Sequence, residues 1–235
     1  GRALEDRGFD SLWVGEHSHI PTSRATPYPA GGDLPPQYLR MMDPFVSLTL
    51  AASATTSLLV GTSVTLPLEH DLLALAKTIA TIDRLSGGRF QLGVGVGWNE
   101  EELANHRPIP WNRRYRALAE CVAAPRTLWT DDDSELHGEF YDFDPVWSFP
   151  KPVQHPHPPI ICGTTPSLAS TRPAMPPIRN LTPFRSATVL TSLRNQPPIW
   201  QPVLPAASAT QPYSLNSGAI ASEPPPKNPH AEFWR

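Results

Sequence analysis

The sequence predicts an α/β fold built on a parallel sheet, either a doubly wound sheet or a (β/α)₈ barrel. Short apolar segments alternate with amphipathic segments of helical period through the first two thirds of the chain. Such near-continuous apolar strands are typical of parallel sheets that are covered on both faces. The predicted strands also end in polar residues, and both fold types bind ligands at that edge.

Four strands and three helices follow from the hydrophobic pattern and the end signals. The strands are expected over 11–17, 57–67, 89–98 and 157–164, and the helices over 43–55, 71–88 and 112–129. Asp43 and Pro44 form a typical helix start. The second helix carries an apolar stripe and ends at Gly87 and Gly88. Pro125 is expected to kink or end the third helix.

This alternation stops near residue 165 and divides the chain into two predicted parts. Residues 1–165 are expected to form the α/β domain. Residues 166–235 are rich in proline and have neither strand nor helix periodicity. We therefore expect an irregular or disordered tail there. The chain has 30 prolines in 235 residues, well above the usual ~5%.

Composition excludes several classes of protein. The formal net charge is −3, and the absence of a long Lys/Arg run argues against a nucleic-acid partner. No apolar stretch approaches the ~18 residues that a membrane span needs, and the first residues lack the layout of a signal peptide. Cys121 and Cys162 lie far apart without metal-binding spacing, which suits a reducing compartment. The sequence thus predicts a cytoplasmic location.

Glycine occupies every second position at the end of the third predicted strand. Gly93, Gly95 and Gly97 should point to one face, with Leu92 and Val94 on the other. A bare face either admits a ligand close to the backbone or accepts a large side chain of a neighbouring strand. A dinucleotide fingerprint fails, because the third glycine of GxGxxG and its following helix are missing.

Four stretches, in order, resemble the bacterial luciferase-like superfamily of flavin- or F420-dependent oxidoreductases and monooxygenases. They are EDRGFDSLWVGEH (5–17), VGTSVTLP (60–67), ATIDRLSGGRFQLGVGVGWNEEE (80–102) and GEFYDFDPVWSFPKPVQHPHPPIICGTT (138–165). The resemblance implies a (β/α)₈ barrel with the flavin-type ring lying over the carboxyl ends of the strands. It also suggests that the bare glycine face gives clearance to that ring, which is the interpretation we favour.

The resemblance also implies which residues form the site. Glu16 and His17 would lie against the cofactor, with His17 donating or accepting a proton beside the redox centre. The resemblance implies cofactor contacts by Thr62, Ser63, Val64, Gly95, Gly97, Trp98 and Asn99. In the family, a cis peptide often occupies the place of Ser63–Val64. The three glutamates 100–102 are expected to favour the start of a helix.

The cofactor implied is coenzyme F420, with FMN as the alternative, and the substrate a small organic molecule. The Glu16–His17 pair and the GTSV stretch favour F420. One departure bears on the substrate: F420-dependent sugar-phosphate dehydrogenases tend to have Gly-Glu where this chain has Gly97–Trp98. No metal belongs to this interpretation.

A different class of enzyme is suggested by His17 and His19. A His-x-His pair at the end of a barrel strand is how metal-dependent hydrolases hold a divalent ion that activates water. Such sites take further ligands from later strands, and the fourth predicted strand ends in Cys162 and Gly163 without a histidine. This hydrolase remains the second enzyme hypothesis.

The resemblance further implies a chain truncated at both ends. The family's first strand would precede residue 1, and strands 6–8 are not recognisable after residue 165. A full barrel takes ~250 residues, and an incomplete one leaves open sheet edges. A catalytically inactive remnant, at most pairing as a homodimer, is therefore kept as the alternative to an active oxidoreductase.

Overall fold

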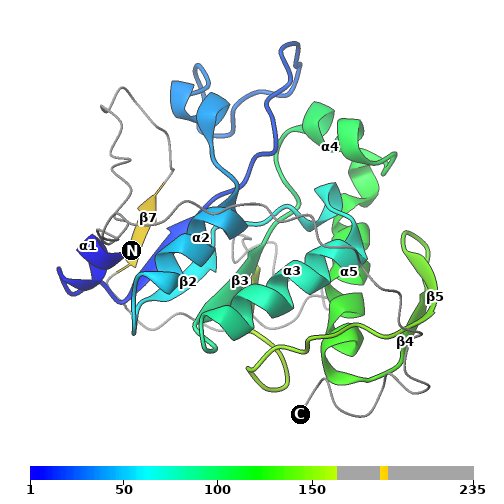
Figure 1. Ribbon diagram of the computed structural model, residues 1–235. Helices are drawn as coiled ribbons and strands as arrows, with labels where there is room; N and C mark the ends of the chain where they lie inside the picture. Colours follow the sequence, from blue (N-terminus) through cyan, green and yellow to red (C-terminus); the bar gives the residue numbers. More distant parts are fainter. Residues whose placement is uncertain (163–185, 190–235) are drawn as a thin grey trace, which may run out of the picture. The chain divides into compact units, whose positions relative to one another are not determined.

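The predicted α/β fold with a parallel sheet is confirmed in the computed structural model, which describes residues 1–162 and the backbone of 186–189. The strands of the main sheet are β1 (Ser11–Val14), β2 (Leu59–Thr62), β3 (Phe90–Val94), β6 (Ile160–Cys162) and β7 (Ser186–Val189). Their order is β6-β3-β2-β1-β7, and all neighbours are parallel (Figure 1). The four predicted strands are present, although each is shorter than expected.

The helices are α1 (Arg2–Glu5), α2 (Pro44–Ser53), α3 (Leu72–Leu85), α4 (Glu100–His106) and α5 (Arg114–Thr130), with 3₁₀ turns η1 (Pro36–Arg40), η2 (Pro67–Glu69) and η3 (Trp111–Arg113). The three predicted helices begin within two residues of their expected starts, as α2, α3 and α5. Asp43 caps α2 by accepting the Val46 amide at 2.9 Å, and Asp71 caps α3 by accepting the Ala74 amide at 2.9 Å. Both caps fix the direction in which a helix leaves a strand-end loop.

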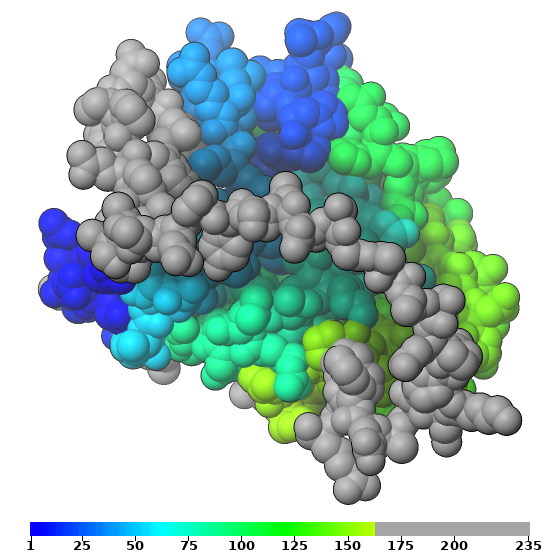
Figure 2. All heavy atoms as spheres, viewed as in Figure 1, coloured from blue at the N-terminus to red at the C-terminus, as the bar shows by residue number. Residues whose placement is uncertain are grey.

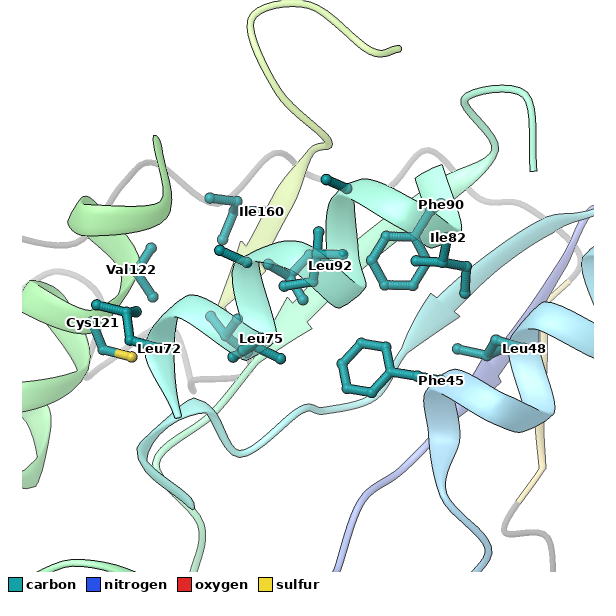
Figure 3. Packing of buried hydrophobic residues seen from close by; sticks show 14 of the residues in the cluster. Phe45, Leu48, Leu72, Leu75, Ile82, Phe90, Leu92, Cys121, Val122 and Ile160 are labelled. Atoms are coloured by element: carbon teal, nitrogen blue, oxygen red, sulfur yellow. The ribbon is translucent and has the colours of Figure 1, made fainter. Parts of the chain in front are cut away.

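One face of the sheet packs against α2 and α3, which lie side by side over the strands (Figure 1). The core between the sheet and these helices is aromatic and aliphatic (Figure 3). It contains Phe45 and Leu48 of α2, Leu75 and Ile82 of α3, Phe90 and Leu92 of β3, Cys121 and Val122 of α5, and Ile160 of β6. On the other face, Leu59, Gln91 and Ile161 stay partly exposed. Burial of the first face fixes the register of the strands.

Pro125 was expected to kink or end the third predicted helix. It does not end the helix, so the prediction of a helix end there is wrong. α5 continues to Thr130 with Pro125 inside it. Leu118, Cys121 and Leu128 remain buried along the helix. Packing of this apolar face, rather than local propensity, decides where the helix ends.

The strands β4 (Ser134–His137), β5 (Asp142–Val146) and β7 were not predicted. β4 and β5 form an antiparallel hairpin that follows α5, and the Glu120 carboxylate accepts the amides of Phe140 and Tyr141 at its turn. Strand β7 lies within 166–235, where we expected irregular chain, and it pairs with β1. A four-residue strand is too short for its periodicity to stand out. The rest of the predicted tail lies outside the described residues.

A buried carboxylate ties α3 to the segment before β6. Asp83 accepts the amides of Val153 and Gln154 at 2.7 and 3.0 Å, and the side-chain amide of Gln154 at 2.6 Å. We expect Asp83→Asn to lower the free energy of unfolding by about 3 kcal/mol. One of the two accepting oxygens would become an NH₂ group, which would face an N–H donor in a buried site and leave it without an acceptor. Urea unfolding measures this. The exposed control Asp133→Asn should change stability little.

Within the part of the chain that the structure describes, no helix has the length and apolar character required to cross a bilayer.

Candidate functional site

Polar loops gather where β1, β2 and β3 end. Because these strands are parallel, their carboxyl ends share one edge of the sheet. β1 leads into Glu16 and His17, β2 into Ser63 and Val64, and β3 into the segment that starts α4. The structure therefore brings the predicted site residues to one edge.

His17 is buried and held from both ring nitrogens. Its side chain is 7% exposed. Nδ1 lies 2.6 Å from Glu102 Oε2, and Nε2 lies 3.1 Å from the indole Nε1 of Trp98. An indole N–H can only donate, so Nε2 accepts, and the single proton of the neutral ring lies on Nδ1 and is donated to Glu102. For His17 to take up a second proton, the bond from Trp98 must break.

Glu16, the neighbour of His17, is directed to other partners. Its Oε2 accepts the Leu66 amide at 2.7 Å, and its Oε1 lies 2.7 Å from His70 Nε2. Burial alone would lower the pKa of His70, but the hydrogen bond and the charge of Glu16 outweigh it and raise that pKa. The buried Glu16 carboxylate thus holds the loop after β2 in place, while the acid paired with His17 is Glu102.

The peptide bond between Ser63 and Val64 is cis, as the family resemblance implies. Ser63 is exposed and Val64 is half-buried. The hydroxyl of Thr62, in contrast, is used inside the protein: it donates to the Gly93 carbonyl at 2.7 Å and accepts the Gly93 amide at 3.0 Å. Of the three residues predicted to meet the cofactor here, Ser63 is exposed, whereas the Val64 side chain packs over Gly93 and Gly95.

The expectation that the glycine face is open is wrong at Gly93 and Gly95. A Cβ at Gly93 would overlap the Thr62 carbonyl oxygen, and one at Gly95 would lie 2.6 Å from Val64 Cγ2. The neighbouring strand-end segment therefore fills the space, which is the packing alternative. Gly97 has a different reason: its φ is +73°, a backbone conformation that side chains disfavour.

Asn99 has a structural role that the sequence did not assign. Its side-chain Oδ1 accepts the Glu102 amide at 3.2 Å and caps α4. The residue is 1% exposed, yet its Nδ2 has no hydrogen-bond partner among the described residues. Thr65 Oγ1 is also buried without one. Unpartnered buried polar atoms are rare in proteins, so these two are available to a bound molecule.

Two aromatic rings contact His17, and a third packs against both of them. Tyr38 and Trp98 contact His17 at centroid distances of 5.4 and 5.6 Å, and Tyr28 contacts both of them at 5.5 and 5.8 Å. Burial and the hydrogen bond with Tyr28 raise the pKa of Tyr38 to about 12. Arg24 lies over the Trp98 ring at 5.7 Å. The site is thus walled by aromatic side chains, with one cation at its rim.

The segment that brings these tyrosines is fastened to α4, and the two surfaces meet in Figure 2. Glu101 accepts the amides of Ala25 and Thr26. Hydrogen bonds from Thr26 and Ala25 lower the pKa of Glu101 to about 2. The hydrogen bonds from Ala25 and Thr26 to the Glu101 carboxylate should therefore be fully formed at pH 5. They should be lost only as the pH falls toward the lowered pKa of Glu101.

Glu101→Gln is expected to loosen this segment without unfolding the sheet. An amide is a weaker acceptor for two backbone N–H groups than a carboxylate. Hydrogen exchange should become faster at residues 24–28 and stay unchanged in α3. The exposed neighbour supplies the control, since Glu100→Gln should leave both regions as they are. Unchanged exchange in the Glu101 variant would contradict the assignment.

Several site residues escaped prediction: Glu102, Glu69, His70, His106, Tyr28 and Tyr38. For Glu102 a signal existed. It stands three residues after the cap Asn99, the position where a glutamate usually turns back to the capping residue. Here it turns to His17 instead, a contact that only the tertiary structure supplies.

His17 and His19 do not form a metal site together. His19 is bonded through Nδ1 to Ser18 Oγ at 2.8 Å and through Nε2 to Asn105 Nδ2 at 2.8 Å. Across residues 1–162, no group of three or more His, Cys, Asp or Glu side chains is arranged to hold a metal ion. The geometry gives the hydrolase hypothesis no support.

The chain is similar in sequence to several known proteins. An uncharacterized protein of Mycobacterium tuberculosis is 47% identical over 165 residues, covering 69% of this chain and 58% of the relative. An F420-dependent glucose-6-phosphate dehydrogenase of Amycolatopsis mediterranei is 32% identical over 153 residues, covering 64% and 42%. An FMNH(2)-dependent dimethylsulfone monooxygenase of Pseudomonas putida is 37% identical over 123 residues, covering 50% and 33%.

Among solved structures, an F420-dependent secondary alcohol dehydrogenase in complex with an F420-acetone adduct is similar in fold. The TM-score is 0.53 at 24% identity, covering 68% of this chain and 44% of the other. The chain spans about half the length of these relatives. The family model described as luciferase-like monooxygenase matches residues 1–172. The chain therefore belongs to the luciferase-like monooxygenase family.

Proposed function

We propose that the protein is an oxidoreductase that exchanges a hydride between coenzyme F420 and a small organic molecule, with FMN as the alternative cofactor. The observation that carries the proposal is the buried His17, held between Glu102 and Trp98 at the edge where the strands end. A neutral imidazole with its proton on Nδ1 has Nε2 as its basic atom. That atom becomes available when the Trp98 side chain turns away.

The residues at this edge fit a flat, polar-rimmed cofactor. Nδ2 of Asn99 and Oγ1 of Thr65 are buried without partners in the described part of the chain. The exposed Ser63 and the half-buried Val64 directly precede Thr65 in the loop after β2. We assign the cofactor to Ser63, Val64, Trp98 and Asn99, and not to the face at Gly93 and Gly95, which Thr62 and Val64 fill. When bound, the cofactor supplies the redox centre that takes or gives the hydride.

His17 has the complementary task. Oxidation of an alcohol-like group releases a proton together with the hydride, and a base within reach of that group must take it. Glu102 donates no proton in this arrangement. Its carboxylate accepts the Nδ1 proton at 2.6 Å and so holds the ring in the tautomer whose Nε2 can accept.

Relatives with printed activities use both kinds of cofactor, F420 in a glucose-6-phosphate dehydrogenase and FMNH(2) in a dimethylsulfone monooxygenase. We favour F420 because the Glu16–His17 pair and the GTSV stretch resemble the corresponding stretches of F420-dependent family members. A cytoplasmic location and a homodimer remain predictions of the same proposal.

The proposal is tested by titrating the protein with F420 and, separately, with FMN, followed by absorbance and fluorescence. F420 is expected to bind at tens of micromolar or better, and Trp98→Ala should weaken its binding. If neither cofactor binds, the chain is the inactive remnant considered from the sequence.

With a bound cofactor and a panel of small alcohols, His17→Gln should slow cofactor reduction by about 10²–10⁴-fold, the usual contribution of a positioned acid or base. Glutamine preserves polarity and approximate size but takes up no proton. The exposed His137 gives the matched control, since His137→Gln should leave the rate unchanged. A His17 variant that reduces the cofactor at the original rate would refute the role of the imidazole.

A further inference from the structure

Arg24, at the rim of the aromatic wall beside His17, has no carboxylate partner in the described part of the chain. Its guanidinium carbon lies 5.7 Å from the centroid of the Trp98 ring. Its hydrogen bond to the Thr26 carbonyl is 3.4 Å long, beyond the usual range. The ion pairs formed among residues 1–162 do not include it. A guanidinium has five N–H donors, so this half-buried one can still bind a ligand.

The backbone that carries Arg24 is fixed. The Glu101 carboxylate accepts the amides of Ala25 and Thr26, which directly follow Arg24. The Thr26 hydroxyl also accepts the first amide of α4 at 3.3 Å. These bonds join the segment to the start of α4, just after Trp98. Arg24 is therefore held over the Trp98 ring by an ordered segment, which lowers the entropy cost of binding a ligand there.

Trp98 links Arg24 to the proposed base. Its indole N–H donates to His17 Nε2 at 3.1 Å, while the face of the same ring meets the guanidinium. The base and the cation are therefore separated by one indole ring and its two contacts. When the Trp98 side chain turns away and frees Nε2, the guanidinium also loses its contact with the ring. A molecule that enters then meets a base on one side and a cation on the other.

The charges around Arg24 favour a ligand with a single negative charge. Tyr38 adds no charge, because burial and the hydrogen bond with Tyr28 raise its pKa to about 12 and keep the phenol protonated. Glu101 is ionised, since the hydrogen bonds that it accepts, first that from Thr26, lower its pKa to about 2. One guanidinium beside that carboxylate suits a carboxylate ligand, which it can bind through two parallel hydrogen bonds. A doubly charged phosphate would be repelled more strongly by Glu101.

We propose that Arg24 determines substrate specificity by binding a carboxylate of the substrate, so that the substrate is a small hydroxycarboxylic acid. The inference rests on the proposed function, because it places the reacting hydroxyl group beside His17. Oxidation of that hydroxyl to a carbonyl releases a hydride, which the cofactor of the proposed function takes, and a proton, which Nε2 takes. The carboxylate has no part in these bond changes. Arg24 holds it and thereby orients the hydroxyl.

The first test uses the whole chain without cofactor and follows the indole Nε1 signal of Trp98 by nitrogen-15 NMR. At constant ionic strength, acetate should draw the guanidinium from the ring and shift the signal saturably. Acetamide, its neutral analogue of the same shape, should not. Arg24→Gln should lose the shift, and the exposed control Arg7→Gln should keep it. An equal shift with acetamide, an acetate shift that survives in Arg24→Gln, or tighter binding of inorganic phosphate would overturn the proposal.

The second test follows cofactor reduction by a panel of small hydroxy acids and their amides. The acids are expected to have a KM about 10- to 100-fold lower than the amides, the range that a hydrogen bond to a charged group contributes. Arg24→Gln should remove this difference by raising the KM of the acids, with kcat unchanged. Equal KM values of acids and amides in the wild type would overturn the proposal. Weaker binding of F420 or FMN to Arg24→Gln would also do so, because the guanidinium would then belong to the cofactor.

The two proposals fail separately. The acetate titration needs no cofactor and decides whether Arg24 binds a carboxylate. If neither F420 nor FMN binds, or if no alcohol reduces the cofactor, the proposed function fails and the result of the titration still stands. If neutral alcohols reduce the cofactor and hydroxy acids do not, the role of Arg24 is refuted while the proposed function survives.

Discussion

Gly93→Ala is expected to lower the free energy of unfolding by about 3 kcal/mol, the upper end of the usual cost of overpacking. The new methyl group would overlap the Thr62 carbonyl oxygen, which belongs to the backbone of the adjacent strand. The Thr62 hydroxyl is also fixed, since it bonds both the amide and the carbonyl of Gly93. Neither partner can turn aside as a flexible side chain would. Urea unfolding of the two proteins measures the loss.

Gly95 provides the matched comparison, because its neighbour is a side chain. A methyl group there would lie 2.6 Å from Val64 Cγ2. Gly95→Ala should cost about 1–3 kcal/mol, and adding Val64→Ala should recover part of it, since removing the isopropyl group makes room. The double-mutant cycle reports this coupling. Gly93→Ala should show no such recovery. Equal stability of Gly93→Ala and wild type would mean that this face is open, as the sequence first indicated.

The stability of the protein is expected to fall as the pH rises from 6 to 9, by about 1.4 kcal/mol per pH unit from Glu69 alone. The sign follows from proton counts. Burial, and then the charges of Glu102 and Glu16, raise the pKa of Glu69 from 4.5 to about 9, so over this range the folded protein keeps one proton that the unfolded chain has released. Stability falls with pH wherever the folded state holds more protons. The slope should vanish above pH 9, where both states are ionised.

Glu69→Gln removes the titrating group while keeping its shape. Its stability curve should lack this slope, so the variant should exceed the wild type by about 4 kcal/mol at pH 9 relative to their difference at pH 6. His70, whose pKa is also raised, contributes a falling slope to both proteins, which cancels in the comparison. Glu100→Gln serves as control, because its carboxyl group is exposed. Parallel curves for Glu69→Gln and wild type would show that Glu69 is ionised in the folded protein.

Much of the fold could be predicted because it depends on neighbours in the chain. The caps Asp43 and Asp71, the apolar stripe of α3 and its end at Gly87 and Gly88 all act within a few residues. The hairpin β4–β5 and strand β7 escaped, because four or five residues carry too little periodicity. The sequence likewise predicts that His17 lies at a strand end, and it shows that the Ser63–Val64 stretch resembles a family motif.

By itself, the sequence determined the strand and helix pattern, the family and the edge of the sheet at which His17 lies. Only the tertiary structure decided what surrounds that residue. Its partner Glu102 stands 85 positions away, and the glycine face proved to be filled by Thr62 and Val64. The reason is physical: periodicity and caps act over a few residues. The partner of a buried polar group, in contrast, is whichever donor or acceptor the packing of distant loops brings within about 3 Å.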